Sequence, residues 1–392
     1  MSGDGVVIVG AGTAGITAAT TLRSKGFSGP VTLIGAEAEQ PYRRTALTKD
    51  LLAADLSAER LTLQKPRVWD ERDIEFVRGV AATSIDTTSR TVVCDDGREV
   101  GYRALILATG ATAARPDWLD PDVRSVRTLD DALAVRRTIE RSGRLAVIGG
   151  GLIGLELAAS AASHDIPVDV IEADGQLLGR VVPDVVSDWF FRLHEERGAS
   201  VRLGARVDRA STREIALDGG AVIEGPVVAA VGMTPNTALA RAAGVETVDA
   251  GIVVDGRFAT ATTGVFAAGD AAALPDALTG APSLGGHWFG ATDHGRAVAD
   301  SVLAYLDGGQ SELFADVPRA WTIQYGANVQ MVGWPALGGL AVDYTVGVDG
   351  SLDDADATVR VSVDGRLIGA VTVGRAASAR ECRSEIAVGL TM

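Results

Sequence analysis

The clearest hydrophobic pattern is a short apolar run that ends in a glycine-rich turn and continues into a stretch of small residues. Val6–Val9 is an apolar run of strand length, and three glycines follow it in G-x-G-x-x-G spacing: Gly10, Gly12 and Gly15. Residues 14–22 predict a helix, and residues 30–34 predict a second buried strand. Glu37 lies just past that strand, 22 residues after Gly15. This order predicts a βαβ unit that binds a dinucleotide.

The same pattern occurs a second time, 139 residues further along the chain. An apolar run leads into the second set of glycines, Gly149, Gly151 and Gly154. Val168–Ile171 predicts the second strand of this unit, and Glu172 ends it, 18 residues after Gly154. Two units with their full context predict two dinucleotide-binding domains and an α/β fold with parallel sheets.

The residue types suit the chemistry of a dinucleotide. The first glycine permits a tight turn, the second lets the backbone approach a pyrophosphate, and the third lets the helix pack against the strand. The helix N-terminus then offers N–H groups to the phosphates. Glu37 and Glu172 would accept hydrogen bonds from ribose hydroxyls. Because Glu172 would repel a 2′-phosphate and 173–175 supplies no arginine, we expect NADH rather than NADPH at the second unit; alternatively, Glu172 simply faces solvent.

Further apolar runs extend this picture. Residues 105–108 lead into Thr109-Gly110, and residues 265–268 end at Gly269-Asp270. Asp270 suits either binding of a ligand's hydroxyls or a helix N-cap. Near the end of the chain, three segments predict the short strands of a further small domain: 343–348, 357–363 and 366–373.

Composition excludes several classes of protein. The 392 residues predict two to three domains, and 47% hydrophobic content predicts a globular chain. A net charge of −15 argues against a nucleic-acid-binding protein. We find no apolar stretch that would span a membrane and no signal peptide, so we expect a cytoplasmic protein. Two distant cysteines and four histidines without paired spacing predict neither a redox dithiol nor a metal site.

The ordered motifs resemble a known family, the flavin-dependent pyridine nucleotide reductases with the glutathione reductase-type fold, and within it the ferredoxin reductases of oxygenase systems. The segments that carry the resemblance are GAGTAG, PYRRTALTKDLL, LATGA, GGGLIGLELA, VFAAGDAA and WTIQY. The resemblance implies an FAD-binding domain of residues 1–112 and 243–316, an NAD-binding domain of residues 113–242, and a C-terminal α+β domain of residues 317–392 that covers the flavin.

The resemblance also implies catalytic roles for Lys49, Glu156 and Trp321. Lys49 is one of only three lysines, and in relatives the matching lysine lies near the flavin's reactive nitrogen, paired with the acid that matches Glu156. A cation there would favour the reduced, negatively charged flavin. The alternatives are an exposed lysine, a solvated helix carboxylate at 156 and a tryptophan at 321 that only packs in a core.

The chain departs from the family pattern at three places beside the flavin. Thr45, Ala46 and Thr48 replace Pro, Pro and Ser of the family, and Thr322 and Ile323 replace Ser and Asp. A third segment retains Trp288, but Gly286 and His287 replace an acid and a serine at the start of a predicted helix whose N-terminus would point at the flavin. His287 suits a proton donor or a polar residue at the helix start. These departures put the electron acceptor in question more than the flavin.

Together the motifs predict a set of residues that bind the two cofactors, FAD and NADH: Gly10, Gly12, Ala14, Gly15, Glu37, Arg44, Lys49, Ala108, Thr109, Gly110, Gly149, Gly151, Ile153, Gly154, Glu156, Glu172, Gly232, Gly269, Asp270, His287, Trp288 and Trp321. We expect hydride transfer from NADH to FAD and single-electron transfer to a transiently bound ferredoxin that feeds a P450 or a Rieske oxygenase. The protein would be a monomer or a homodimer.

Two other functions stay open at this point: a flavin oxidoreductase acting on a small organic substrate over the flavin, and a signalling flavoprotein similar to apoptosis-inducing factor. Docking of an acidic ferredoxin would require arginines that converge at the flavin edge. The candidates are Arg43, Arg44, Arg296 and Arg319.

Overall fold

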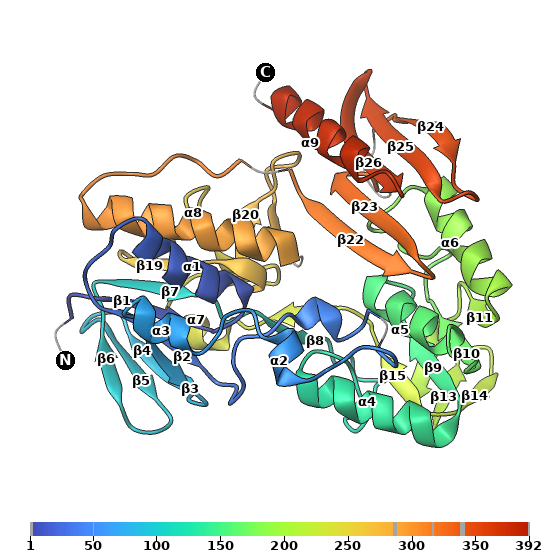
Figure 1. Ribbon diagram of the computed structural model, residues 1–392, viewed down its shortest axis with the longest axis horizontal. Helices are drawn as coiled ribbons and strands as arrows, with labels where there is room; N and C mark the ends of the chain where they lie inside the picture. The colour runs from blue at the N-terminus through green and yellow to red at the C-terminus, as the bar shows by residue number, and fades with distance from the viewer. Residues whose placement is uncertain (1–2, 50, 285–287, 316, 338–341, 391–392) are drawn as a thin grey trace. The chain divides into compact units, whose positions relative to one another are not determined.

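The computed structural model describes residues 3–49, 51–284, 288–315, 317–337 and 342–390. The chain divides into two compact units (Figure 1). The first unit consists of residues 1–43, 57–112 and 233–316, and the second of residues 44–56, 113–232 and 317–392. Each unit contains one of the two predicted βαβ motifs, so the predicted α/β class with two dinucleotide-binding folds is confirmed.

The first unit is built on a five-stranded parallel sheet in the order β19-β7-β1-β2-β3. Its strands are β1 Val6–Val9, β2 Val31–Gly35, β3 Glu75–Arg78, β7 Ala104–Leu107 and β19 Val265–Ala267. All four residues of β1 are buried, as expected of a strand covered on both faces. Helices α1 (Thr13–Ser24) and α8 (Trp288–Leu306) lie side by side over this sheet (Figure 1).

Smaller elements complete the first unit. One antiparallel sheet contains β4 Ala82–Asp86, β5 Thr91–Cys94 and β6 Glu99–Gly101; a second sheet contains β17 Thr247–Val248, β18 Gly251–Val253, β20 Ala272–Pro275 and β21 Pro282–Leu284. The short helices are α2 Ala58–Leu61, α3 Arg67–Glu71, α7 Ala238–Ala242 and the 3₁₀ helix η2 Gly269–Ala271. Two further strands, β8 Ala111–Ala113 and β16 Met233–Pro235, pair where the unit boundaries fall.

The second unit contains two larger sheets. The parallel sheet, in the order β11-β10-β9-β15, is formed by β9 Leu145–Ile148, β10 Val168–Ile171, β11 Ala199–Arg202 and β15 Val227–Ala229. The antiparallel sheet, in the order β22-β23-β26-β25-β24, is formed by β22 Arg319–Gln324, β23 Ala327–Gly333, β24 Thr345–Ser351, β25 Asp356–Val363 and β26 Arg366–Val373, with α9 Ala376–Leu390 packed against it. The strands predicted near the C-terminus are therefore present.

The remaining elements of the second unit are α4 Leu129–Ser142, α5 Leu152–Ala162, α6 Asp184–Glu196, the 3₁₀ helix η1 Arg44–Ala46 and a three-stranded sheet of β12 Val207–Ala210, β13 Glu214–Leu217 and β14 Val222–Glu224. Helix α4 begins at a capping box, in which the Thr128 hydroxyl accepts from the Asp131 N–H and the Asp131 carboxylate accepts from the Thr128 N–H.

The unit boundaries differ from the predicted domain boundaries in two places. Residues 233–242 belong with the first unit, because Asn236 donates to the Thr109 carbonyl and accepts from the Thr109 hydroxyl. Residues 44–56 belong with the second unit, because the Leu52 N–H donates to Ser160 and Arg136 donates to the Ala54 carbonyl. The finer division into three domains stays a prediction.

Candidate functional site

The glycine loop of the first unit leaves room for a ligand at one position only. A Cβ on Gly10, whose φ is +113°, would stand 2.0 Å from the Ala108 carbonyl oxygen. A Cβ on Gly15 would stand 1.9 Å from the Gly10 carbonyl oxygen. A Cβ on Gly12, the N-cap of α1, would meet no protein atom within 4 Å. The loop is therefore closed where helix and strand pack and open at the helix N-terminus, where a pyrophosphate would sit.

The glycine loop of the second unit has the same geometry. Gly149 has a φ of +108°, and its Cβ would stand 2.4 Å from the Ala230 carbonyl oxygen. The Cβ of Gly154 would stand 1.9 Å from the Gly149 carbonyl oxygen, whereas Gly151, the N-cap of α5, has no protein atom within 4 Å of its Cβ position. Ile153 is 43% exposed on this first turn.

The acids at the ends of the second strands are held in place. The Glu172 carboxylate accepts hydrogen bonds from the Gly150 N–H at 2.6 Å and from the Asp174 N–H at 2.8 Å. Glu172 is thus fixed beside the second glycine loop, and the alternative of a simply solvated carboxylate is wrong. In the first unit, Glu37 accepts a hydrogen bond from the Tyr42 hydroxyl at 2.5 Å.

Other predicted cofactor-binding residues of the first unit lie at the ends of β7 and β19. Thr109 follows β7 and donates its hydroxyl to the Asn236 carbonyl at 2.7 Å. Asp270 lies inside η2, whose N-cap is Ala268, so an N-cap role for Asp270 is excluded. The remaining predicted positions of this group are the turn glycines Gly110 and Gly269, with φ of +69° and +72°, together with Ala14 at the start of α1 and Trp288 at the start of α8. Gly286 and His287 lie outside the described residues.

The second unit brings Lys49 and Glu156 together, as the resemblance implies. The Lys49 ammonium pairs with the Glu156 carboxylate, and their side chains are 18% and 5% exposed. The ammonium also lies 4.9 Å from the centroid of the Trp321 ring and 3.5 Å from the Trp321 carbonyl oxygen. Neither an exposed Lys49 nor a solvated Glu156 fits this arrangement, and Trp321 is only partly buried. Gly232 and Arg44 belong to the same unit, where Arg44 donates to the Arg127 carbonyl.

Two departures from the family pattern have a common structural outcome. The hydroxyls of Thr48 and Thr322 both donate to the Glu156 carboxylate, the latter at 2.8 Å. Since threonine keeps the hydroxyl of serine, both replacements preserve a donor to the buried acid. Ile323, which stands where the family has an acid, follows Thr322 in β22 and is 46% exposed.

Sequence reasoning missed two buried histidines. His194 on α6 is fully buried, and burial lowers its pKa to about 4. His294 on α8 is also buried, with a pKa lowered to about 4 by burial; its Nδ1 has no hydrogen-bond partner among the described residues. No spacing or motif marks His194 in the sequence, whereas His294 lies nearly two turns after Trp288, in the helix that was predicted to begin beside the flavin.

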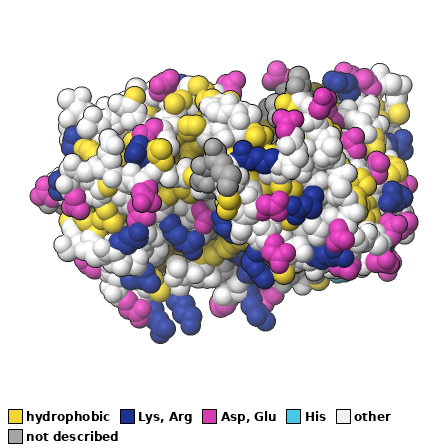
Figure 2. All heavy atoms as spheres, turned by 90° about the horizontal axis from the view of Figure 1, so that it is seen from above, with side chains coloured by type: hydrophobic (Ala, Val, Ile, Leu, Met, Phe, Trp, Pro, Cys, Tyr) yellow, Lys and Arg dark blue, Asp and Glu magenta, His cyan; other side chains and the backbone are white. Residues whose placement is uncertain are grey.

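The docking prediction stays open. Arg43 and Arg296 belong to the first unit, and Arg44 and Arg319 to the second. Arg296 forms an ion pair with Asp293 at 3.1 Å. On the face shown in Figure 2, basic and acidic side chains are interspersed, so this face has no large area of one sign.

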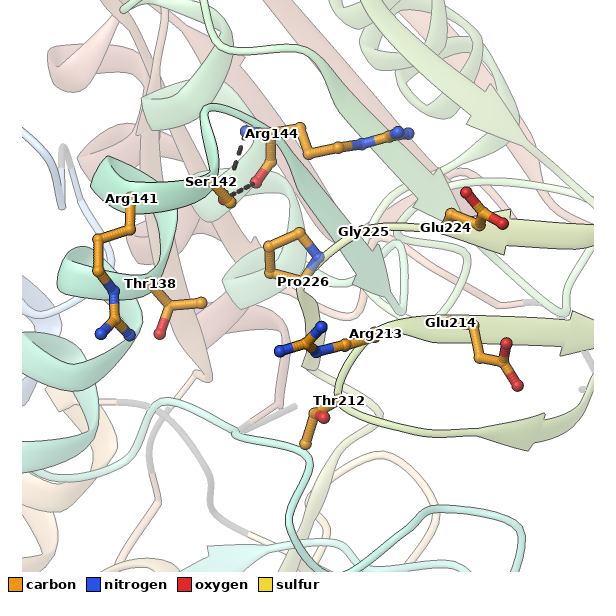
Figure 3. Close-up of a pocket in the computed structure, with 10 residues that line it drawn as sticks. All are labelled: Thr138, Arg141, Ser142, Arg144, Thr212, Arg213, Glu214, Glu224, Gly225 and Pro226. Carbon is orange, nitrogen blue, oxygen red and sulfur yellow. Dashed lines mark hydrogen bonds between the residues drawn. The ribbon is translucent and has the colours of Figure 1, made fainter.

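A pocket of about 790 Å³ lies elsewhere in the second unit, between the end of α4 and the β13–β14 sheet. It is lined by Thr138, Arg141, Ser142, Arg144, Thr212, Arg213, Glu214, Glu224, Gly225 and Pro226 (Figure 3). None of these residues belongs to the glycine loop or to the cluster at Lys49. The pocket therefore gives no support to the small-substrate alternative.

The two cysteines do not lie together, and each is buried in a different unit. Cys94 and Cys382 are both buried and free, one in each unit, and burial raises the pKa of each thiol. Within the part of the chain that the structure describes, no cluster of His, Cys, Asp and Glu could hold a metal ion. Over the same residues, no helix combines the length and apolar character needed to cross a bilayer.

Comparison with known proteins now identifies the family. The family model described as pyridine nucleotide-disulphide oxidoreductase matches residues 4–295. The chain is 35% identical to the ferredoxin–NAD(+) reductase component of the anthranilate 1,2-dioxygenase system of Burkholderia cepacia, over 99% of this chain and 95% of that protein. The chain belongs to the pyridine nucleotide-disulphide oxidoreductase family. It falls among the ferredoxin reductases of oxygenase systems, as the motifs predicted.

Further relatives agree with this family. The chain is 32% identical to putidaredoxin reductase of Pseudomonas putida, over 95% of this chain and 89% of that protein. The reductase in the crystal structure of a covalent putidaredoxin reductase–putidaredoxin complex superposes with a TM-score of 0.90 at 30% identity, covering 99% of this chain and 94% of that chain. The ferredoxin reductase for a cytochrome P450 system of Rhodopseudomonas palustris gives a TM-score of 0.88 at 31% identity, covering 96% and 92%.

The residues present fit the two cofactors of the family, FAD and NADH. Both glycine loops are open at the helix N-terminus and closed elsewhere, which is the shape a pyrophosphate requires. A carboxylate is fixed beside the second loop, where it would face a ribose and repel a 2′-phosphate. The prediction of an NADH-dependent flavoprotein oxidoreductase is thereby confirmed at the level of the family.

Proposed function

We propose that this protein takes a hydride from NADH and passes electrons singly to a ferredoxin of an oxygenase system. The observation that carries the proposal is the pair of glycine loops, one in each unit, with the same closed and open positions. Two separate dinucleotide sites are what a flavoprotein requires to hold FAD and NADH at once. The anthranilate dioxygenase relative and the putidaredoxin complex support ferredoxin as the acceptor.

The first unit would hold FAD and the second NADH. The N-terminus of α1 would bind the FAD pyrophosphate and Glu37 its ribose, while the N-terminus of α5 and Glu172 would do the same for NADH. FAD, when bound, accepts two electrons at once and releases them singly. The residues of the chain would contribute the binding and orientation of both cofactors.

Lys49 would supply a fixed positive charge to the reactive part of the flavin. Its ammonium is held by Glu156, which in turn accepts from the hydroxyls of Thr48 and Thr322. A charge that is already oriented stabilises developing negative charge without further reorganisation. Trp321, in contact with the Lys49 ammonium, would cover the same region.

The electron path to the acceptor would not involve a thiol, because both cysteines are buried with raised pKa values. We propose direct transfer to a ferredoxin that binds transiently. The proposed compartment is the cytoplasm, where NADH is available, and the protein would act as a monomer or homodimer.

Anaerobic stopped-flow mixing tests the proposal. The FAD-loaded protein is mixed with NADH and, separately, with NADPH; cytochrome c is then added with and without a panel of ferredoxins. We expect fast bleaching of the flavin by NADH, slower bleaching by NADPH, and cytochrome reduction that depends on a ferredoxin. Fast bleaching without gain from any ferredoxin would favour a small organic substrate as acceptor. No bleaching by either nucleotide would refute the proposed function.

A further inference from the structure

A continuous chain of buried hydrogen bonds connects the Lys49–Glu156 pair to helix α6. We call it the Glu156 chain; it consists of Glu156, Thr322, Gln324, His194 and Tyr325. The Thr322 hydroxyl contacts Glu156 at 2.8 Å, Gln324 Nε2 contacts that hydroxyl at 3.1 Å, His194 Nε2 contacts Gln324 Oε1 at 2.8 Å, and the Tyr325 hydroxyl contacts His194 Nδ1 at 3.0 Å. All five residues belong to the second unit.

The direction of every bond in this chain follows from its chemistry. A carboxylate only accepts, so Thr322 donates to Glu156. The Thr322 oxygen then accepts from the Gln324 amide nitrogen, which can only donate. The Gln324 amide oxygen must therefore accept from His194 Nε2–H. In a neutral ring, His194 Nδ1 then accepts from the Tyr325 hydroxyl. All donors thus point toward Glu156.

The bond between Tyr325 and His194 has this direction only when the histidine is neutral, because an imidazolium would donate from both ring nitrogens. Burial lowers the pKa of His194 to about 4, against the opposing effect of the hydrogen bond to Gln324. A neutral imidazole carries one donor and one acceptor nitrogen, which is what the chain requires of it.

Burial makes the arrangement difficult to rearrange. His194 and Thr322 are 0% exposed, Gln324 is 1% and Glu156 is 4%. Rotating Thr322, Gln324 or His194 would leave a buried donor or acceptor without a partner, which is energetically unfavourable. A chain in which each group is satisfied in only one way behaves as a single unit.

The backbone at the far end of the chain indicates the same constraint. Tyr325 has a φ of +51°, in the left-handed region that non-glycine residues avoid. It forms, with Gly326, the two-residue turn between β22 and β23. Its hydroxyl reaches His194, so the strained residue is the one that ends the chain.

We propose that His194 and Gln324 are positioning residues that orient the Thr322 hydroxyl toward Glu156 and thereby fix the carboxylate that holds Lys49. Neither residue contacts a cofactor in this role; both act through Thr322 and Glu156. The inference rests on the proposed function, since it assigns these residues to the charge that Lys49 would present to the flavin. It predicts that the rate of hydride transfer depends on the donor-to-acceptor direction of the hydrogen bonds in the Glu156 chain.

The first experiment determines the protonation of His194, and with it the direction of its hydrogen bond to Gln324, without catalytic turnover. The FAD-loaded protein, labelled with ¹⁵N at its four histidines, is titrated by NMR between pH 5 and 8, and His194 is assigned from the loss of its signals in His194→Gln. We expect a neutral ring with Nε2 protonated throughout this range. A ring without a proton on Nε2 could not donate to Gln324 and would overturn the inference whatever the protein's activity.

The second experiment reverses the hydrogen bond between Thr322 and residue 324 with the nearly isosteric substitution Gln324→Glu. A carboxylate at 324 cannot donate to Thr322, so the Thr322 hydroxyl would turn from Glu156 toward residue 324. We expect the rate constant of flavin reduction at saturating NADH to fall about tenfold, with the Kd for NADH within twofold of the original value. We also expect His194 to become protonated near neutral pH in this variant. The same change at an exposed position, Gln310→Glu, is the matched control and should alter neither value.

A second pair of variants covers the case in which Gln324→Glu fails to fold. His194→Gln keeps a donor toward Gln324, whereas His194→Leu removes it. Both would lower the Tm, but only His194→Leu should slow flavin reduction about tenfold. Equal rates in the two variants would overturn the inference. If the unsubstituted protein is not reduced by NADH, the proposed function fails, and the NMR result still decides the direction of the chain.

Discussion

At the scale of single residues, the glycines of each loop divide into two kinds. The first and third glycines are required by the fold, because a Cβ at either would overlap a backbone carbonyl. The middle glycine is different. Gly12 and Gly151 have φ of −75° and −82°, which any residue adopts, and their Cβ positions are open. Nothing in the folded chain explains why they are glycine, so a ligand that approaches the backbone there does.

Gly151→Ala should therefore separate binding from folding. The added methyl group contacts no protein atom but occupies the space of the NADH pyrophosphate. We expect the Kd for NADH, measured by fluorescence titration, to rise at least tenfold while the Tm stays within about 2 °C. Gly154→Ala is the contrasting variant and should lower the Tm, because its Cβ would stand 1.9 Å from the Gly149 carbonyl oxygen. Unchanged NADH affinity in Gly151→Ala would contradict the placement of the pyrophosphate.

Glu172 should set the choice between the two nicotinamide cofactors. Its carboxylate is fixed beside the second loop, where its charge would oppose a 2′-phosphate. We expect Glu172→Gln to raise the ratio of kcat/KM for NADPH to kcat/KM for NADH about tenfold, equivalent to about 1.4 kcal/mol. Steady-state kinetics with both cofactors measure the ratio. Glu37→Gln makes the same change at the first loop and should leave the ratio unaltered; a shift of the ratio in that variant instead would reverse the assignment of the two units.

At the scale of elements, strand β22 places Thr322 of the WTIQY motif against Glu156. Its buried positions alternate, with Ala320, Thr322 and Gln324 facing inward and Ile323 exposed. Helix α5 packs against this strand, which is why Glu156 and the inward-facing Thr322 meet. The two-residue turn that follows has positive φ at both positions, as the favoured type I′ hairpin turn requires.

Tyr325→Phe should show how much the hairpin depends on its contact with α6. Phenylalanine keeps the ring and the unfavourable φ of +51° but leaves His194 Nδ1 buried without a partner. We expect the free energy of unfolding to fall by about 1–3 kcal/mol, measured by urea denaturation. Tyr305→Phe, on α8 in the first unit, is the comparison variant at a partly exposed tyrosine and should cost less. A loss no larger in Tyr325→Phe than in Tyr305→Phe would mean that the hydroxyl contributes nothing at this position.

How far the sequence predicts these elements depends on the range of the interactions involved. The βαβ units are local, so Val6–Val9 and Val168–Ile171 were predicted with the bounds the structure has. The pairing of Lys49 with Glu156 could be inferred only from the family resemblance, because 107 positions separate them. His194 could not be found at all, since its role depends on α6 meeting β22, and no local pattern encodes that contact.

At the scale of the whole molecule, the net charge of −15 must be reconciled with an acidic partner. Like charges raise the cost of association, so a ferredoxin would have to meet a local area of the opposite sign. The interspersed charges of the face in Figure 2 do not provide one. Ile323, which stands where the family has an acid, is one exposed uncharged residue of the second unit.

The free energy of unfolding of both units should decrease as the pH falls, for the same reason. Among the residues that the structure describes, each unit buries one histidine, His194 or His294, with a pKa lowered to about 4, whereas an unfolded histidine titrates near 6.5. Between these values the unfolded chain binds more protons than the folded one. The free energy of unfolding must therefore fall as the pH falls from about 6.5 toward 4, and neither histidine contributes such a slope above that window.

Each histidine should account for about 2 kcal/mol of lost stability by pH 5. We expect the Tm of the FAD-loaded protein, followed by circular dichroism, to decrease steadily from pH 7 to pH 5. His194→Gln removes one titrating group and should flatten the part of the transition that belongs to the second unit. His164→Gln, at an exposed histidine of that same unit, should keep the original slope. A Tm that is constant over this range, or a slope that His194→Gln leaves unchanged, would show that the buried histidines do not govern acid unfolding.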